Sequence, residues 1–149
     1  MKRVLRLLLV CCCLAALLLP VGCADQKETS EAMIVANELR HDALKINNSI
    51  KTFYTNVKLG SVNEESDGDK VTEPLPGKDA NMAERQEAAK SLTVRSALEK
   101  SGLTEYLKED VISDFVFDAE KNIYYKDDIK PENIKGTLSL STKLGDILD

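Results

Sequence analysis

The chain has 149 residues, of which 25 are acidic and 20 are basic, for a formal net charge of −5 at neutral pH. Proteins that bind nucleic acid carry a basic face, so this charge argues against DNA or RNA as a partner. Aromatic residues make up only 5% of the chain and tryptophan is missing, which argues against a broad stacking platform for carbohydrate. The length allows one domain of modest size.

The first 22 residues have the pattern of an export signal. Lys2, Arg3 and Arg6 precede an apolar run over residues 7–21, which is too short to span a bilayer because a spanning helix takes about 20 apolar residues. A basic start, a short apolar middle and a small residue before the cleavage point are typical of a secretory signal peptide. We therefore expect residues 1–22 to be a signal peptide, whose removal lowers the net charge to −8.

The end of this signal, Pro20-Val21-Gly22-Cys23, resembles the lipobox of bacterial lipoproteins. In that family a cysteine is diacylated, the signal is cleaved before it, and the new N-terminus usually receives a further acyl chain. The resemblance implies cleavage between Gly22 and Cys23, with a covalent diacylglycerol and an N-acyl chain on Cys23 and no other cofactor. Pro20 stands where the family usually has leucine. The alternative is an ordinary signal peptide that is cleaved elsewhere.

The other three cysteines, Cys11, Cys12 and Cys13, fall in the apolar run, so the predicted mature chain has no free thiol and no disulfide. Cysteine catalysis, zinc thiolate sites and thiol redox chemistry are thereby excluded. In enteric lipoproteins an aspartate directly after the acylated cysteine retains the protein at the inner membrane. Ala24 stands there in this chain, which favours the outer membrane if the source is Gram-negative. We expect an exported, membrane-anchored lipoprotein in which residues 23–29 form a lipidated tether.

Residues 30–149 are expected to form a single small domain that begins with a long helix over about 31–58. Apolar residues recur in steps of four and three along residues 32–57, a spacing that is typical of a packed helical seam. The flanking positions almost lack the charges that would specify a coiled-coil partner, which favours packing within the domain. Self-association through the 32–57 helix is the alternative. Ser30 is the expected N-cap, and Gly60 is the expected stop.

Residues 60–80 are rich in Gly, Pro, Asn, Ser, Asp and Glu, which predicts a flexible, solvated loop. The paired carboxylates Asp67 and Asp69 lie in this loop, and Asp127 and Asp128 form a second pair in a later polar loop; both pairs are expected to be ordinary solvated groups. Asn81, followed three residues later by a glutamate, has the capping-box pattern and opens a second helix over about 82–100. The apolar residues of that helix do not form one stripe, so it is either covered on two sides or bent.

The hydrophobic period changes to two after a short helical turn over about residues 103–110. Runs at 114–117 and 123–125 predict a β-hairpin, and the alternating segment 136–141 predicts a third strand whose two leucines face inward. The sequence therefore predicts an α+β fold with two long helices, a short helix and a small three-stranded antiparallel β-sheet at the C-terminal end.

The densest aromatic cluster combines Phe115 and Phe117 with Tyr124 and Tyr125. Alternation places the two phenylalanines on one face and the two tyrosines on opposite faces. We therefore expect one tyrosine in the core and the other exposed, as a candidate contact with a protein partner. The single histidine, His41, is expected on the exposed face of the first helix. The chain has no phosphate-binding, nucleophile-elbow or metal-binding motif, so we expect neither a catalytic residue nor a metal site.

Residues 92–98, Leu-Thr-Val-Arg-Ser-Ala-Leu, are similar to the helix that opens BON domains, small envelope modules associated with phospholipid or partner binding. The strands that follow this helix in the family do not follow at the same distance here, so no site is carried over. The leading hypothesis is a non-catalytic, lipid-anchored protein that binds or scaffolds another envelope component. The alternatives are a surface-displayed module facing a host or neighbouring cells, and a small envelope enzyme.

Overall fold

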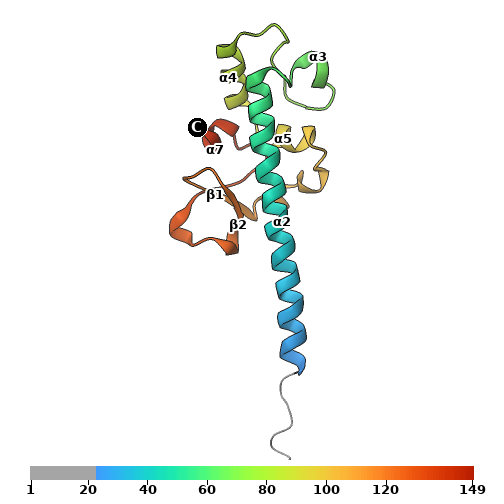
Figure 1. Cartoon of the computed structure of the whole chain (residues 1–149), viewed down its shortest axis with the longest axis vertical. Coiled ribbons are helices and arrows are strands. Elements are labelled where there is room, and N and C mark those ends of the chain that lie inside the picture. The colour runs from blue at the N-terminus through green and yellow to red at the C-terminus, as the bar shows by residue number, and fades with distance from the viewer. Residues whose placement is uncertain (1–22) are drawn as a thin grey trace, which may run out of the picture. The chain divides into compact units, whose positions relative to one another are not determined.

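The computed structural model describes residues 23–149, so the predicted signal peptide, Gly22 included, lies outside the described residues. The chain divides into two units, one ending at Asn37 and one spanning Glu38–Asp149. The hydrophobic core belongs to the second unit, and Figure 1 shows the short elements of this unit gathered along its part of helix α2 (Cys23–Leu59). The predicted α+β fold is confirmed. Within residues 23–149, no helix is long and apolar enough to cross a membrane.

Helix α2 is longer than predicted. The prediction that it starts after an N-cap at Ser30 is wrong, because residues 23–29, the expected tether, already form its first turns. These residues include no glycine or proline, so nothing in the local sequence stops the helix there. The helix ends at Leu59, and Gly60 follows with a left-handed φ of +76°. The predicted stop at Gly60 is therefore confirmed.

The apolar seam of α2 is buried along its C-terminal part. Ala32 is exposed, and each of the apolar residues 33–35 is more than half exposed. The seam residues of the second unit from Ala43 onward are at most 4% exposed and belong to its core: Ala43, Ile46, Ile50, Phe53 and Val57. Packing within the domain therefore accounts for this part of the seam.

Most of the 60–80 segment is irregular, as predicted, but the expectation that it is solvated throughout is wrong. The segment contains the short helix α3 (Glu64–Asp67). It also places Val62, Val71 and Leu75 in the hydrophobic core, each at most 6% exposed. Polar composition alone predicted a loop without burial, but three well-spaced apolar side chains are enough to dock the segment on the domain.

Two carboxylates hold the same segment against helix α5 (Val94–Lys100). Glu73 accepts hydrogen bonds from the backbone N–H of Thr93 at 2.9 Å and from the hydroxyl of buried Ser96. Glu99 accepts hydrogen bonds from the backbone N–H and the hydroxyl of Thr72, at 2.7 and 2.8 Å. Because Thr93 makes no side-chain cap of its own, Glu73 supplies the acceptor at the start of α5.

The second predicted helix is divided into α4 (Met82–Ser91) and α5, so the bend is the correct alternative. The predicted capping box is present at the start of α4. Between the two helices Leu92 is extended, with ψ of 152°, and its carbonyl accepts a hydrogen bond from the N–H of Leu144 at 2.8 Å. Leu144 begins α7 (Leu144–Leu148). Pairing with this distant segment therefore interrupts the helix.

Two short turns, η1 (Thr104–Tyr106) and α6 (Glu109–Ile112), lead into the sheet, where one short helix was predicted. The sheet has the antiparallel order β2-β1-β3, with β1 (Phe115–Asp118) in the centre. Its partners are β2 (Ile123–Tyr125) and β3 (Ile134–Thr137). The predicted hairpin and the three-stranded antiparallel sheet are confirmed.

The third strand lies earlier than predicted. The prediction of a strand over residues 136–141 is wrong, because β3 ends at Thr137 and the following residues turn, with the N–H of Thr142 bonded to the carbonyl of Ser139 at 3.1 Å. Leu138 and Leu140 are nevertheless buried, at 1% and 4% exposed. The alternation correctly indicated which side chains face inward, although not the backbone conformation that places them there.

Candidate partner-binding site

A small pocket lies between α2 and β2, within the second unit, and has a volume of about 210 Å³. Its α2 side includes Leu44, an apolar residue that is 57% exposed. The pocket is lined by Arg40, Ala43, Leu44, Ile123, Tyr124, Tyr125 and Asp128. Both tyrosines that the sequence singled out as partner contacts are thus found at one concave site. We call this site the β2 pocket.

The two tyrosines lie on opposite faces of the sheet, as strand alternation predicts. The expectation that one is buried and the other exposed is wrong, because both are half-buried. Tyr125 packs against the core, where its ring and that of Phe115 form a T-shaped contact with a centroid distance of 6.3 Å. Burial raises the pKa of both phenols, and the neighbouring carboxylates Asp118 for Tyr124 and Asp127 for Tyr125 raise it further. Both phenols therefore stay protonated at neutral pH.

An ion pair joins the two sides of the β2 pocket. The guanidinium of Arg40 donates to both carboxylate oxygens of Asp128, with nitrogen–oxygen distances between 2.8 and 3.1 Å. The Asp128 hydrogen bond, followed by the charge of the same group, raises the pKa of Arg40. The Arg40 side chain is 57% exposed, so the pair adds little stability, but its forked geometry ties the chain after β2 to α2.

A larger pocket of about 740 Å³ adjoins the β2 pocket, with which it shares Tyr124 and Asp128. It lies between the β1–β2 turn and the connection that leads through η2 (Lys126–Asp128) and η3 (Pro131–Asn133) to β3. Four carboxylates and two lysines contribute to its lining: Asp118, Glu120, Asp128, Glu132, Lys130 and Lys135. We call it the acidic pocket.

Hydrogen bonds keep the Asp118 carboxyl ionised. Burial alone would raise the pKa of this carboxyl, but donation from the backbone N–H of Asn122 and from the Tyr124 hydroxyl outweighs burial and lowers it. The carboxylate accepts the Asn122 N–H at 2.9 Å, which also closes the hairpin turn. Asp118 is therefore a fixed negative charge at the edge of the acidic pocket.

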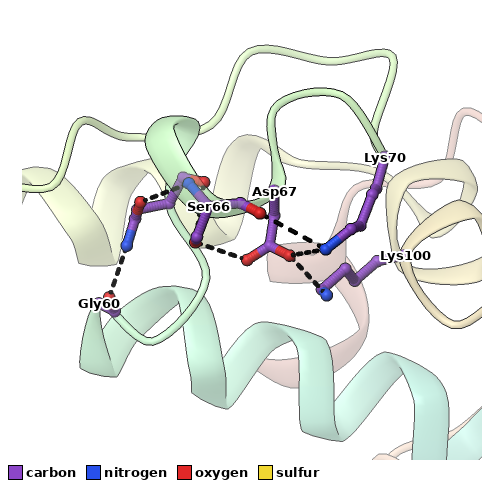
Figure 2. Close-up of polar contacts among 6 residues, drawn as sticks. Gly60, Ser66, Asp67, Lys70 and Lys100 are labelled. Atoms are coloured by element: carbon purple, nitrogen blue, oxygen red, sulfur yellow. Dashed lines mark hydrogen bonds and ion pairs between the residues drawn. The ribbon is translucent and has the colours of Figure 1, made fainter.

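The expectation that Asp67 is an ordinary solvated carboxylate is wrong. Its side chain is only 7% exposed and lies 2.6 Å from the ammonium of Lys100 and 3.1 Å from that of Lys70, as Figure 2 shows. The hydrogen bond from Lys100 is the main cause that lowers the pKa of Asp67 to about 2, with Ser66 and Lys70 contributing. Because all partners belong to the 60–80 segment and α5, the cluster holds the fold together and offers no open site.

The other predicted site residues stand apart from these pockets. His41 is exposed on α2, as predicted. Cys23, the predicted acylation site, is the first residue of α2, and Gly22 lies outside the described residues. In the part of the chain that the structure describes, no group of three or more His, Cys, Asp or Glu side chains could hold a metal ion.

Sequence reasoning missed Arg40 and Leu44 of the β2 pocket, and it was wrong to expect an ordinary solvated carboxylate at Asp128, which pairs with Arg40. The ion pair joins residues 88 positions apart, and no local spacing marks such a contact. Leu44 carried a weak signal, since it is a large apolar residue on a helix but lies off the apolar seam. To find this pocket, a search of the sequence would have had to combine the off-seam leucine with the aromatic strand.

Comparisons of the chain with protein-family models, with curated proteins and with solved structures return no match. Its function is therefore inferred from its own sequence and geometry.

Proposed function

We propose that the protein is a lipid-anchored cell-envelope protein that binds or scaffolds another envelope component and catalyses no reaction. The observation that carries this proposal is the β2 pocket, where exposed Leu44 and half-buried Tyr125 offer apolar surface to a partner. Tyrosines in pockets are enriched among the residues that dominate protein–protein binding. A partner side chain in this pocket would bury apolar surface without any opening of the core.

The anchoring half of the proposal rests on the leader sequence. A cysteine at position 23 after a lipobox-like segment would carry two or three acyl chains, and more than one chain is needed for stable attachment to a bilayer. The predicted mature chain, with a net charge of −8, gains nothing from adsorbing to anionic lipid. The protein would therefore meet its partner while it is held at the membrane by its acyl chains alone.

Intact mass spectrometry of the N-terminal peptide from the membrane fraction tests the anchor. We expect the wild-type peptide to begin at Cys23 and to carry acyl chains, and the Cys23→Ala variant to lack them and to leave the membrane fraction. An unmodified wild-type peptide that begins at another residue would refute the lipoprotein proposal. Protease treatment of intact cells then separates a periplasm-facing protein, which survives, from a surface-displayed one.

Photo-crosslinking tests partner binding. A benzophenone amino acid replaces Leu44 in the acylated, membrane-bound protein, and the matched control places it at Met82, which is 80% exposed and lies on α4 away from both pockets. We expect a discrete protein adduct from position 44 and none of the same mass from position 82. No adduct from position 44, or the same adducts from both positions, would refute binding at this site.

A further inference from the structure

The acidic pocket has the size of a small-molecule site. Its volume of about 740 Å³ falls within the range of roughly 300–1,000 Å³ that is usual for pockets that bind small ligands. Three segments build it: the β1–β2 turn with Asp118 and Glu120, strand β2 with Tyr124, and the connection over residues 128–135. Figure 1 shows this connection, in orange, as a loop beside the sheet. A ligand in the pocket would therefore contact all three segments of the second unit at once.

Several polar side chains that line the pocket have no partner within the protein. In the described part of the chain, five of them make no side-chain hydrogen bond and no ion pair: Glu120, Lys130, Glu132, Asn133 and Lys135. Lysine donates hydrogen bonds, a carboxylate accepts them and asparagine does both, so donors and acceptors line one cavity. Such a lining suits a ligand whose groups both donate and accept, and it singles out neither an anion nor a cation.

Another part of the lining is apolar. Tyr124 is half-buried and lies on the sheet face away from the hydrophobic core. Its hydroxyl donates to the Asp118 carboxylate, which fixes the orientation of the ring. Ile129 and Ile134, which are also half-buried, add aliphatic surface to the same pocket. The acidic pocket therefore combines one oriented aromatic ring with polar groups of both kinds.

Carbohydrate is the ligand chemistry that matches both parts of the lining. A sugar ring has an apolar face of C–H groups and a rim of hydroxyls, each of which can donate one hydrogen bond and accept two. A zwitterion would instead give up strongly hydrated charges for exposed lysines and glutamates, whose ion pairs contribute little. A phosphate or another anion would face the three carboxylates that are not paired with Arg40. One ring serves one sugar unit, so the scarcity of aromatic residues does not oppose such a site.

We propose that the acidic pocket binds an uncharged oligosaccharide, one ring of which packs on Tyr124 while its hydroxyls bond to the polar side chains of the 128–135 connection. Asp118 is the fixed acceptor of the site, and Asn133 both donates and accepts. The inference goes beyond the proposed function, because it assigns a second kind of ligand to a pocket that Leu44 does not line.

The probe is an array of neutral, sialylated and sulfated glycans. The acylated protein is applied in polyoxyethylene micelles, because a detergent with a sugar headgroup would compete for the site. We expect binding to neutral glycans, and saturable binding of the best neutral trisaccharide in isothermal titration calorimetry.

Variants and NMR then locate the bound sugar. Asn133→Ala should weaken binding of the trisaccharide roughly three- to tenfold, because hydrogen bonds of the exposed amide are lost. Tyr124→Leu, which removes the ring and its hydroxyl, should weaken it further, and Asp69→Asn, in a residue that lines neither pocket, should bind as the wild type does. On the wild type, the sugar should shift the backbone amide signals of Asn133 and Lys135, a readout that does not depend on how any variant folds.

Binding confined to sialylated or sulfated glycans would overturn the inference, as would failure to bind any glycan on the array. Equal affinity of the wild type and Asn133→Ala, or unchanged amide signals around the pocket, would place the sugar elsewhere and overturn it too. Tighter binding of chitotriose than of its N-acetylated counterpart would show a cation site in place of a neutral one. Crosslinking from position 44 is a separate test, so a protein adduct there without glycan binding would leave the proposed function standing and refute only this inference.

Discussion

Replacing Asp67 with asparagine tests whether a buried carboxylate holds the 60–80 segment on the domain. The substitution keeps the size of the side chain and removes the charge that faces Lys100 at 2.6 Å and Lys70 at 3.1 Å. The carboxylate side chain is 7% exposed, whereas those of Lys100 and Lys70 are 26% and 51% exposed. The released ammonium groups can therefore return to water, and the expected loss is that of the carboxylate interactions.

The expected magnitude follows from the pKa of Asp67. The folded protein lowers this pKa to about 2 from the ordinary value of 3.8, and a difference of one pH unit corresponds to about 1.4 kcal/mol. The upper limit at neutral pH is thus about 2–3 kcal/mol, and screening at the half-exposed Lys70 reduces the expected loss to about 1–2 kcal/mol. Because the folded pKa is the lower one, the stabilisation is complete above pH 3.8 and disappears as the pH falls towards 2.

Urea unfolding followed by far-UV circular dichroism at pH 7 and pH 3 measures this effect. We expect Asp67→Asn to lower the free energy of unfolding at pH 7 and to differ from the wild type by roughly half as much at pH 3. Asp69→Asn is the matched control, since this exposed carboxylate lies two residues away and is not among the partners of Asp67. A loss equal to that of the control, or one that does not shrink at low pH, would refute the structural role of the cluster.

Three further substitutions test the packing of the same domain by thermal and urea unfolding. Gly60→Ala should cost about 2 kcal/mol, because its φ is +76° and a Cβ there would displace the guanidinium of Arg85, which donates to the carbonyl of Lys78 at 2.9 Å. Gly102→Ala, with φ of +68° and open space, should cost about 1 kcal/mol, and equal losses would contradict a cost from displacing Arg85. Leu144→Ala should cost about 2–5 kcal/mol because the side chain is fully buried, and a loss under 1 kcal/mol would place it outside the core. Arg40→Met should lower the free energy of unfolding by less than about 1 kcal/mol because the ion pair is exposed, yet it should reduce crosslinking from the β2 pocket. A loss above about 2 kcal/mol would instead show that the ion pair stabilises the fold.

Local chemistry in the sequence determined the stop of α2, the start of α4 and the change of period at the sheet. Gly60 ends α2 because only a residue without a side chain adopts its left-handed φ easily, and Asn81 with Glu84 caps α4 through contacts within one helical turn. The change of period near Phe115 correctly predicted the sheet, since alternation places neighbouring side chains on opposite faces. Each of these features depends on residues that are close in sequence.

Tertiary contacts decided what local patterns left open. The break between α4 and α5 depends on the backbone of Leu92 pairing with that of Leu144, and the contact of Asp67 with Lys100 adds to the apolar contacts that hold the 60–80 segment. Neither contact follows from periodicity, because the partners lie tens of residues apart. The candidate site has the same origin: sequence reasoning selected Tyr124 and Tyr125 from their strand, but the pocket exists only because α2 packs beside that strand. Side-chain types could be read from the sequence, whereas the concave surface they form depends on which elements the core brings together.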